Sequence, residues 1–190
     1  MAKSKLIVIS APSGCGKTTI AREILKRHPE ILFSVSATTR AKRTEEQHGK
    51  DYFFLSVEEF KKNIHDHELI EWEEIYGNYY GTLKGEVDAA LSKGRSMLFD
   101  VDVNGALSIK TKYPNDTVLI FIEPPSVETL KERLLNRKTE DPETIKKRLD
   151  RVPMELEKGK QFDFHVVNDR LPRSTNEVDG IICEALGVTV

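Results

Sequence analysis

The sequence lacks any apolar run that approaches the ~20 residues needed to cross a membrane. Residues 1–5 lead directly into a short apolar segment, so we expect neither a signal peptide nor a membrane anchor. Cysteine is scarce too: only Cys15 and Cys183 occur, which favours a reducing cytoplasm over a disulfide-stabilised secreted protein. The net charge is only −2, which excludes an overall basic surface for nucleic acid or anionic lipid. No feature indicates an obligate protein partner.

The composition that remains is that of a soluble globular protein. The 190 residues are 38% hydrophobic and 32% charged, and this length supports one core with small appended subdomains. Continuously apolar segments near residues 6, 97, 118 and 165 alternate with helical patterns. Such segments are typical of parallel strands covered on both faces, so we predict an α/β core.

Residues 6–19 are the most informative stretch of the chain. Four apolar residues precede a loop that contains Gly14 and Gly16, and Lys17 and Thr18 open a helical run. Strand, glycine-rich loop and helix in this order predict a phosphate-binding loop. Its backbone N–H groups and helix N-terminus attract a phosphate, the lysine bridges β- and γ-phosphates, and the threonine hydroxyl is a ligand for Mg²⁺.

Two loop residues need separate comment. Ala11 stands where the strict motif has glycine. Alanine would strain the loop backbone only if that position required a positive φ. Cys15 lies near a helix N-terminus, where a thiol pKa is often lowered. The alternative is that Cys15 is simply a small loop residue.

Local patterns predict the other elements. Helices are expected over 16–28, 56–65, 82–94, 126–138, 142–158 and 174–187, with Ser56 and Glu59 forming a capping box and Thr82, Asp141 and Ser174 as N-caps. Residues 76–81 are interpreted as a tyrosine-rich turn. The aromatic region 33–94 is predicted to be an inserted subdomain. The core would comprise 1–32, 95–125 and 156–190, and the charged segment 126–155 a lid.

A second group of residues suits the substrate that receives a phosphoryl group. Arg40 and Arg43 lie three apart in a polar loop, and arginine binds phosphate oxygens bidentately. Tyr52 and Tyr80 add hydroxyl donors. A solvated basic loop is the alternative for this group. Glu71, between Ile70 and Trp72, is placed to accept hydrogen bonds from N–H groups of a ligand.

Acids and bases elsewhere suggest a metal site and a lid. Asp100 follows an apolar strand, where a carboxylate faces the ligand crevice and can assist Mg²⁺ binding, directly or through water. Residues 131–151 hold eight basic and five acidic residues. Beside a phosphate loop, such arginine-rich helices form a plausible lid; alone, they are an ordinary charged helix pair.

Together these motifs resemble guanylate kinase over nearly the whole chain. The matching stretches are residues 10–18, 34–40 with Arg43, 49–52, 70–72, 77–82, 100–102, 124–126 and 167–169. Lys42, Glu45 and His48 depart from the pattern that is usual in this family. The resemblance implies a phosphate-loop kinase fold that phosphorylates GMP, and dGMP, with ATP and Mg²⁺ in purine nucleotide metabolism. The alternatives are a non-catalytic interaction module of the same fold or a kinase for another small acceptor.

The resemblance also implies roles for individual residues. The ATP-binding set is Ala11, Pro12, Ser13, Gly14, Cys15, Gly16, Lys17, Thr18, Thr19, Arg133 and Asn168. The GMP-binding set is Ser36, Arg40, Arg43, Tyr52, Glu71, Tyr80, Thr82 and Asp100, of which Glu71, Thr82 and Asp100 read the guanine. The catalytic set is Lys17, Arg40, Arg137 and Arg148.

Overall fold

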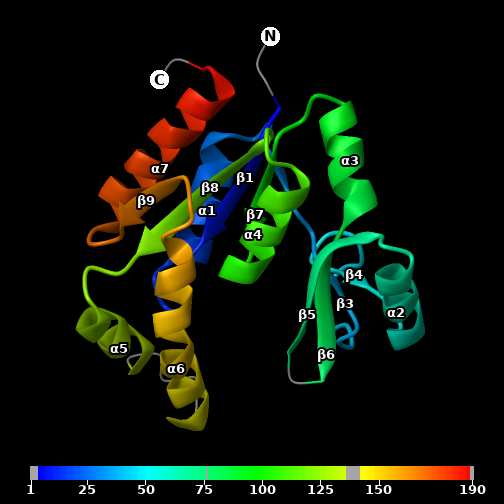
Figure 1. Cartoon of the computed structure of the whole chain (residues 1–190), viewed down its shortest axis with the longest axis horizontal. Helices are drawn as coiled ribbons and strands as arrows, with labels where there is room; N and C mark the ends of the chain where they lie inside the picture. The colour runs from blue at the N-terminus through cyan, green and yellow to red at the C-terminus, as the bar shows by residue number, and fades with distance from the viewer. Residues whose placement is uncertain (1–3, 76, 136–141, 189–190) are drawn as a thin grey trace.

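A parallel five-stranded sheet organises the chain (Figure 1). The computed structural model describes residues 4–75, 77–135 and 142–188. The strand order is β2-β7-β1-β8-β9, and every pairing is parallel. The strands are β1 (Leu6–Ser10), β2 (Leu32–Phe33), β7 (Met97–Asp100), β8 (Thr117–Glu123) and β9 (Phe164–Val167). The predicted α/β core is therefore confirmed.

Helices cover both faces of this sheet, which explains its continuous apolar strands. On one face Ile7 and Ile9 pack with helices α1 (Lys17–Arg27) and α7 (Leu171–Leu186). On the other face Leu6 and Val8 pack with α3 (Lys84–Ser92) and α4 (Val103–Lys112). Successive side chains of a strand point to opposite faces, so a strand buried on both sides must be apolar throughout.

A second, four-stranded sheet lies beside the first, in the order β4-β3-β6-β5 (Figure 1). Its strands are β3 (Ala37–Thr38), β4 (Phe53–Phe54), β5 (Leu69–Ile75) and β6 (Asn78–Leu83). Helix α2 (Val57–His65) covers one face with Phe60. The capping box of Ser56 and Glu59 at its start is confirmed.

Several expectations within 69–112 were wrong. Residues 78–81 belong to β6 rather than to a turn, and Leu83, not Thr82, is the N-cap of α3. Tertiary pairing with β5 outweighs the local turn signals of these residues. Helix α4 was not predicted, because its start directly follows a strand. Val87 and Ala90 of α3 pack into the core cluster, although they fall within the predicted insert 33–94.

Helices α5 (Val127–Leu135) and α6 (Pro142–Gly159) extend from the main sheet on the side of the second sheet (Figure 1). The predicted N-cap Asp141 lies outside the described residues. Helix α7 begins at Leu171 after Arg170, so Ser174 is not its cap; the Ser174 hydroxyl instead donates to the Val167 and Arg170 carbonyls. None of the described helices has the length and apolar character of a membrane span.

Candidate functional site

The phosphate loop connects β1 to α1 and needs glycine at two positions. Gly14 and Gly16 have φ of 95° and 86°, in the left-handed region that favours glycine. A Cβ at Gly16 would also lie 2.6 Å from Asn168 Nδ2. Ala11 is not among the residues with positive φ, so its departure from the strict motif causes no strain. The N-terminal end of α1 therefore remains open to an anion.

Lys17, Thr18 and Asp100 form a connected group at the carboxyl ends of β1 and β7. Lys17 Nζ lies 2.9 Å from Asp100 Oδ1 and donates to the Val101 carbonyl at 2.9 Å. The Thr18 hydroxyl donates to Asp100 Oδ2 at 2.8 Å. A hydroxyl and a carboxylate oxygen side by side are the hard donors that Mg²⁺ prefers, so this pair fits the ion.

Residues from α5, α6 and the segment after β9 surround the loop. Arg148 on α6 donates to Ser13 Oγ at 2.8 Å. Arg133 on α5 donates to the Asn168 carbonyl at 3.0 Å, and Asn168 Nδ2 donates to the Cys15 carbonyl at 2.7 Å. The loop lines a cavity of about 410 Å³ together with Lys147, Arg148 and Arg151. The predicted residues 11–19 and Arg148 thus line one space, whereas Arg133 and Asn168 contact the loop from outside that lining.

Cys15 lines the loop cavity but also belongs to the buried core. Cys15 is fully buried in the main core cluster. Burial raises its pKa to about 12, although the positive charge of Arg133 acts in the opposite direction. The suggestion that the helix N-terminus lowers this pKa was therefore wrong, and the alternative of a small loop residue fits.

The second sheet turns its polar face toward α4. Glu73 pairs with Tyr80 across β5 and β6, so these side chains share a face with Thr82, two residues further along β6. The Thr82 hydroxyl donates to Glu71 Oε1 at 2.6 Å, which places Glu71 on this face as well. Gly81 allows the close approach of the strands, because a Cβ there would lie 2.7 Å from the Glu71 carbonyl oxygen.

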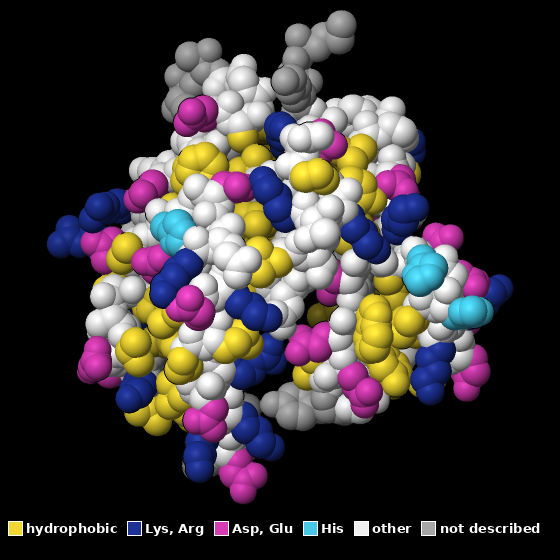
Figure 2. Space-filling model, viewed as in Figure 1, with side chains coloured by type: hydrophobic (Ala, Val, Ile, Leu, Met, Phe, Trp, Pro, Cys, Tyr) yellow, Lys and Arg dark blue, Asp and Glu magenta, His cyan; other side chains and the backbone are white. Residues whose placement is uncertain are grey.

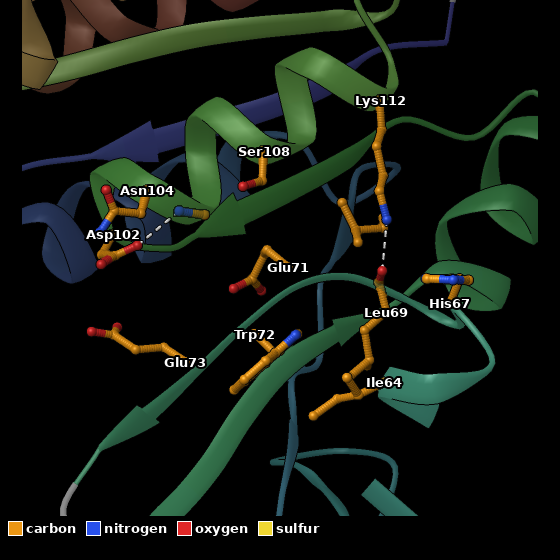
Figure 3. Close-up of a pocket in the computed structure, with 12 residues that line it drawn as sticks. Ile64, His67, Leu69, Glu71, Trp72, Glu73, Asp102, Asn104, Ser108 and Lys112 are labelled. Atoms are coloured by element: carbon orange, nitrogen blue, oxygen red, sulfur yellow. Dashed lines mark hydrogen bonds between the residues drawn. The ribbon is translucent and has the colours of Figure 1, made fainter. Parts of the chain in front are cut away.

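Glu71 lines a second cavity, of about 490 Å³ (Figure 3). Burial raises the pKa of Glu71, the Thr82 hydrogen bond opposes this shift, and the negative charges of Asp102 and Glu73 add to it. A Cβ at Gly105 would lie 3.2 Å from Glu71 Oε2 and 3.4 Å from Asp102 Oδ1. Glycine at the start of α4 therefore leaves room for both carboxylates.

The two cavities meet at Glu73 and Asp102, which line both. Figure 3 shows the carboxylates of Glu71, Glu73 and Asp102 at one side of the second cavity and Lys112 and His67 at the other. Figure 2 shows the molecule hollowed between the α5–α6 arm and the second sheet. The space lined by the glycine-rich loop thus adjoins a carboxylate-lined space.

Arg151 on α6 spans this junction. Its guanidinium lies 3.2 Å from Asp102 Oδ2 and 3.5 Å from Glu73 Oε1. Its Nε lies 3.9 Å from Glu155, a buried carboxyl whose pKa is raised by burial. Neither Arg151, one of the eight basic residues of 131–151, nor Glu155 stands in a recognisable motif, so the sequence did not predict a role for either.

Arg40, Tyr52 and Tyr80 form a third group at the second sheet. The Arg40 guanidinium carbon lies 5.3 Å from the Tyr52 ring centroid, and the Tyr52 and Tyr80 rings are 6.2 Å apart. Arg40 donates to Glu46 Oε1 at 2.6 Å, while Glu46 Oε2 accepts from the Arg43 backbone amide at 2.8 Å. Glu46, missed in the sequence, therefore orders the basic loop.

The remaining predicted residues have less defined surroundings. Ser36 contributes its carbonyl to the amide of Phe53, and the Arg43 side chain is exposed. Arg137 lies outside the described residues. Asp100 was predicted to read a guanine and to assist Mg²⁺, yet both its carboxylate oxygens face Lys17 and Thr18. Asp102, two residues further on, is the carboxylate beside Glu71.

Comparison with known proteins places this arrangement in a family. A family model described as guanylate kinase matches residues 3–185. The chain is 47% identical over 184 residues to a guanylate kinase of Chlorobaculum tepidum, covering 97% of this chain and 94% of that protein. It is 45% identical over 180 residues to a guanylate kinase of Thermotoga maritima, covering 95% and 86%.

A solved structure agrees. The crystal structure of guanylate kinase from Anaplasma phagocytophilum matches with a TM-score of 0.77 and 30% identity, covering 100% of this chain and 89% of that chain. The family model extends over both sheets, the phosphate loop and the α5–α6 arm. The chain therefore belongs to the guanylate kinase family.

Proposed function

We propose that the protein catalyses ATP + GMP ⇌ ADP + GDP. The observation that carries the proposal is the contact between two cavities, one lined by the phosphate loop and the other by Glu71, at Glu73 and Asp102. A transferred phosphoryl group needs its donor and acceptor side by side in this way. dGMP is proposed as a second acceptor.

On the donor side, the loop amides and Lys17 hold the ATP phosphates. Lys17 reaches them by giving up its contacts with Asp100 and Val101, since its amine is a mobile cation. Thr18 and Asp100 would hold Mg²⁺, which neutralises phosphate charge when bound. Arg148 already contacts the loop through Ser13, so it is placed to bind the transferring group. Arg137 is proposed to assist from the lid.

On the acceptor side, we propose that the GMP phosphate is bound by five residues: Ser36, Arg40, Arg43, Tyr52 and Tyr80. Glu46 Oε1 accepts from one terminal nitrogen of Arg40 at 2.6 Å, and the guanidinium has five N–H donors, so Arg40 can hold Glu46 and the phosphate together. No general base is required, since the acceptor oxygen of a phosphate monoester is largely ionised above a pKa of about 6. Catalysis then rests on positioning and charge neutralisation.

The base is read by a set of groups on β5, β6 and α4. Guanine N1–H and its 2-amino group are donors, and Glu71 and Asp102 are the acceptors that face one space. Thr82 fixes the orientation of Glu71 through their hydrogen bond. Adenine lacks both donors and would leave the buried Glu71 without a hydrogen bond from the ligand, which allows discrimination on the order of 10⁴-fold.

The helices α5 and α6 are proposed to act as the lid, within the range 126–155. Their closure over the loop would exclude water and so suppress ATP hydrolysis. We also propose a cytoplasmic setting in purine nucleotide metabolism. The two free cysteines, Cys15 and Cys183, suit a reducing compartment.

An assay of ADP release with GMP, dGMP, AMP, UMP and CMP as acceptors tests the proposal. Rapid release is expected with GMP, and a mass spectrum of the product should identify GDP. Release without any acceptor dependence would indicate an ATPase, and release with another monophosphate alone would indicate a different kinase. A protein that binds GMP but releases no ADP would be the non-catalytic module.

A further inference from the structure

A cluster of metal-ligating side chains lies at the end of α1 remote from the phosphate loop. His28 is the C-cap of α1, and Asp179 and Cys183 lie one turn apart on α7. The potential ligand atoms of these three residues all lie within 4.8 Å of one another. Helix α1 has 11 residues, so the cluster is about 16 Å from the phosphate loop and takes no part in the proposed reaction.

The spacing on α7 brings two of these groups to one face. Residues four apart on a helix are neighbours on its surface, which directs the Asp179 carboxylate and the Cys183 sulfur toward the end of α1. Cys183 is 6% exposed, and the His28 and Asp179 side chains are 14% and 21% exposed. The cluster is thus sheltered but reachable from solvent.

Neighbouring residues orient these groups as they do in metal sites. His28 Nε2 faces Asp179 Oδ1 at 2.6 Å, while its Nδ1 lies 3.2 Å from Glu30 Oε1. A carboxylate on the second ring nitrogen is the usual partner of a metal-binding histidine. Arg27 binds Asp179 Oδ2 at 3.0 Å and leaves Oδ1 directed at the histidine.

We propose that His28, Asp179 and Cys183 bind a divalent cation of the Zn²⁺ class. One nitrogen, one oxygen and one sulfur donor form a mixed set that suits Zn²⁺ rather than Mg²⁺ or Ca²⁺. Tetrahedral zinc places one nitrogen, one oxygen and one sulfur donor roughly 3.3–3.5 Å apart, so binding requires side-chain shifts of about 1 Å. The Cys183 thiol proton is released to solvent as the sulfur–metal bond forms, and water takes the fourth position.

Charge at the cluster favours a cation. The carboxylates of Asp179, on α7, and Glu30, just beyond α1, both lie beside the His28 ring, and Arg27 contributes a positive charge on Asp179. The Cys183 sulfur adds a second negative ligand once its proton has been released. Bound metal would join the end of α1 to α7. The competing explanation is a metal-free ion pair of His28 and Asp179 with the same joining role, and the experiment below separates the two.

The first test is a titration of the chelator-treated full chain with Co²⁺, followed by absorbance. We expect one equivalent to produce a thiolate-to-cobalt charge-transfer band in the near ultraviolet. Cys183→Ala should lose the band, and the matched Cys15→Ala variant should keep it. Absence of the band in the wild type, or its persistence in Cys183→Ala, would overturn the proposal.

Calorimetric titration with Zn²⁺ gives the second test. His28→Gln should weaken binding by more than the roughly 10–100-fold that loss of a second-shell partner causes, and Glu30→Gln by about 10-fold. Zn²⁺ at about 100 times its Kd should raise the wild-type Tm by roughly 5 °C and leave that of His28→Gln unchanged. An equal Zn²⁺ affinity in the wild type and His28→Gln would overturn the proposed metal site and favour the metal-free ion pair of His28 and Asp179.

Discussion

The Thr82 hydroxyl donates a 2.6 Å hydrogen bond to Glu71 Oε1, across two strands of the second sheet. This bond holds a carboxylate in a position where burial raises its pKa. Burial disfavours the charged form of the Glu71 carboxyl until a ligand supplies hydrogen-bond donors to it. The Thr82–Glu71 bond thus connects the pairing of β5 and β6 to the proposed selection of guanine.

Glu71→Gln should lower kcat/KM for GMP by about 10²–10³-fold, because the amide cannot accept from both guanine donors and a charged hydrogen bond is lost. ATP affinity should be unchanged, since Glu71 does not line the loop cavity. Steady-state kinetics with GMP and a binding titration with ATP measure the two quantities. Unchanged GMP kinetics would exclude Glu71 from base reading.

Although Glu71→Gln should lower activity, it should make the folded protein more stable. A carboxyl whose pKa is raised on folding binds more protons in the folded state, so its contribution to stability is present at low pH and is lost as pH rises through the folded pKa. Glu71→Gln should therefore raise the Tm relative to wild type at pH 8, with a smaller gain near pH 4.5. Thermal melts at the two pH values test this, and an equal or lower Tm at pH 8 would contradict it.

The two aspartates after β7 should behave differently. Asp100→Asn should lower kcat by at least about 100-fold with little change in GMP KM, because Asp100 contacts Lys17 and Thr18. Asp102→Asn should raise GMP KM about 10-fold or more, because Asp102 lies beside Glu71. If Asp100→Asn raised KM and Asp102→Asn did not, the guanine contact would belong to Asp100.

Arg148→Ala should reduce kcat by on the order of 10³-fold, since arginines that bind a transferring phosphoryl group have effects of this size. GMP KM should change little because Arg148 contacts the loop side, at Ser13. Arg173→Ala is the matched control: this arginine is 70% exposed on α7. A large rise in GMP KM with kcat retained would remove Arg148 from the transition state.

Cys15 should resist alkylation in the folded protein. Its pKa of about 12 leaves almost no thiolate at pH 8, and the side chain is fully buried. Iodoacetamide labelling of a Cys183→Ala variant, followed by mass spectrometry, isolates this thiol. Labelling as fast as that of the same variant in denaturant would show that the loop opens freely.

The glycine-rich loop and the capping box could be predicted from the sequence because their signals are local. Gly14, Gly16 and Lys17 lie within four residues, and the capping box of Ser56 and Glu59 within another four. The acceptor side depends on pairing between distant segments. Thr82 has the local pattern of a helix cap, yet the β5–β6 ladder places its hydroxyl on Glu71.

Other features depend on packing that no short pattern encodes. The different positions of Asp100 and Asp102 follow from the start of α4, where Asp102 is the N-cap and lies with Glu71 beside Gly105. Arg151 belongs to a charged helix in the sequence, and only the fold brings it to Asp102. The raised pKa of Glu71 likewise arises from burial by residues far along the chain.

The central claim is that a guanine-selective acceptor site adjoins a phosphate loop. The most direct measurement is kcat/KM for GMP and for AMP in the same ADP-release assay. We predict a GMP to AMP ratio on the order of 10⁴ in the wild type, falling sharply in Glu71→Gln. Equal use of GMP and AMP by the wild type, or a ratio that Glu71→Gln leaves unchanged, would contradict the account.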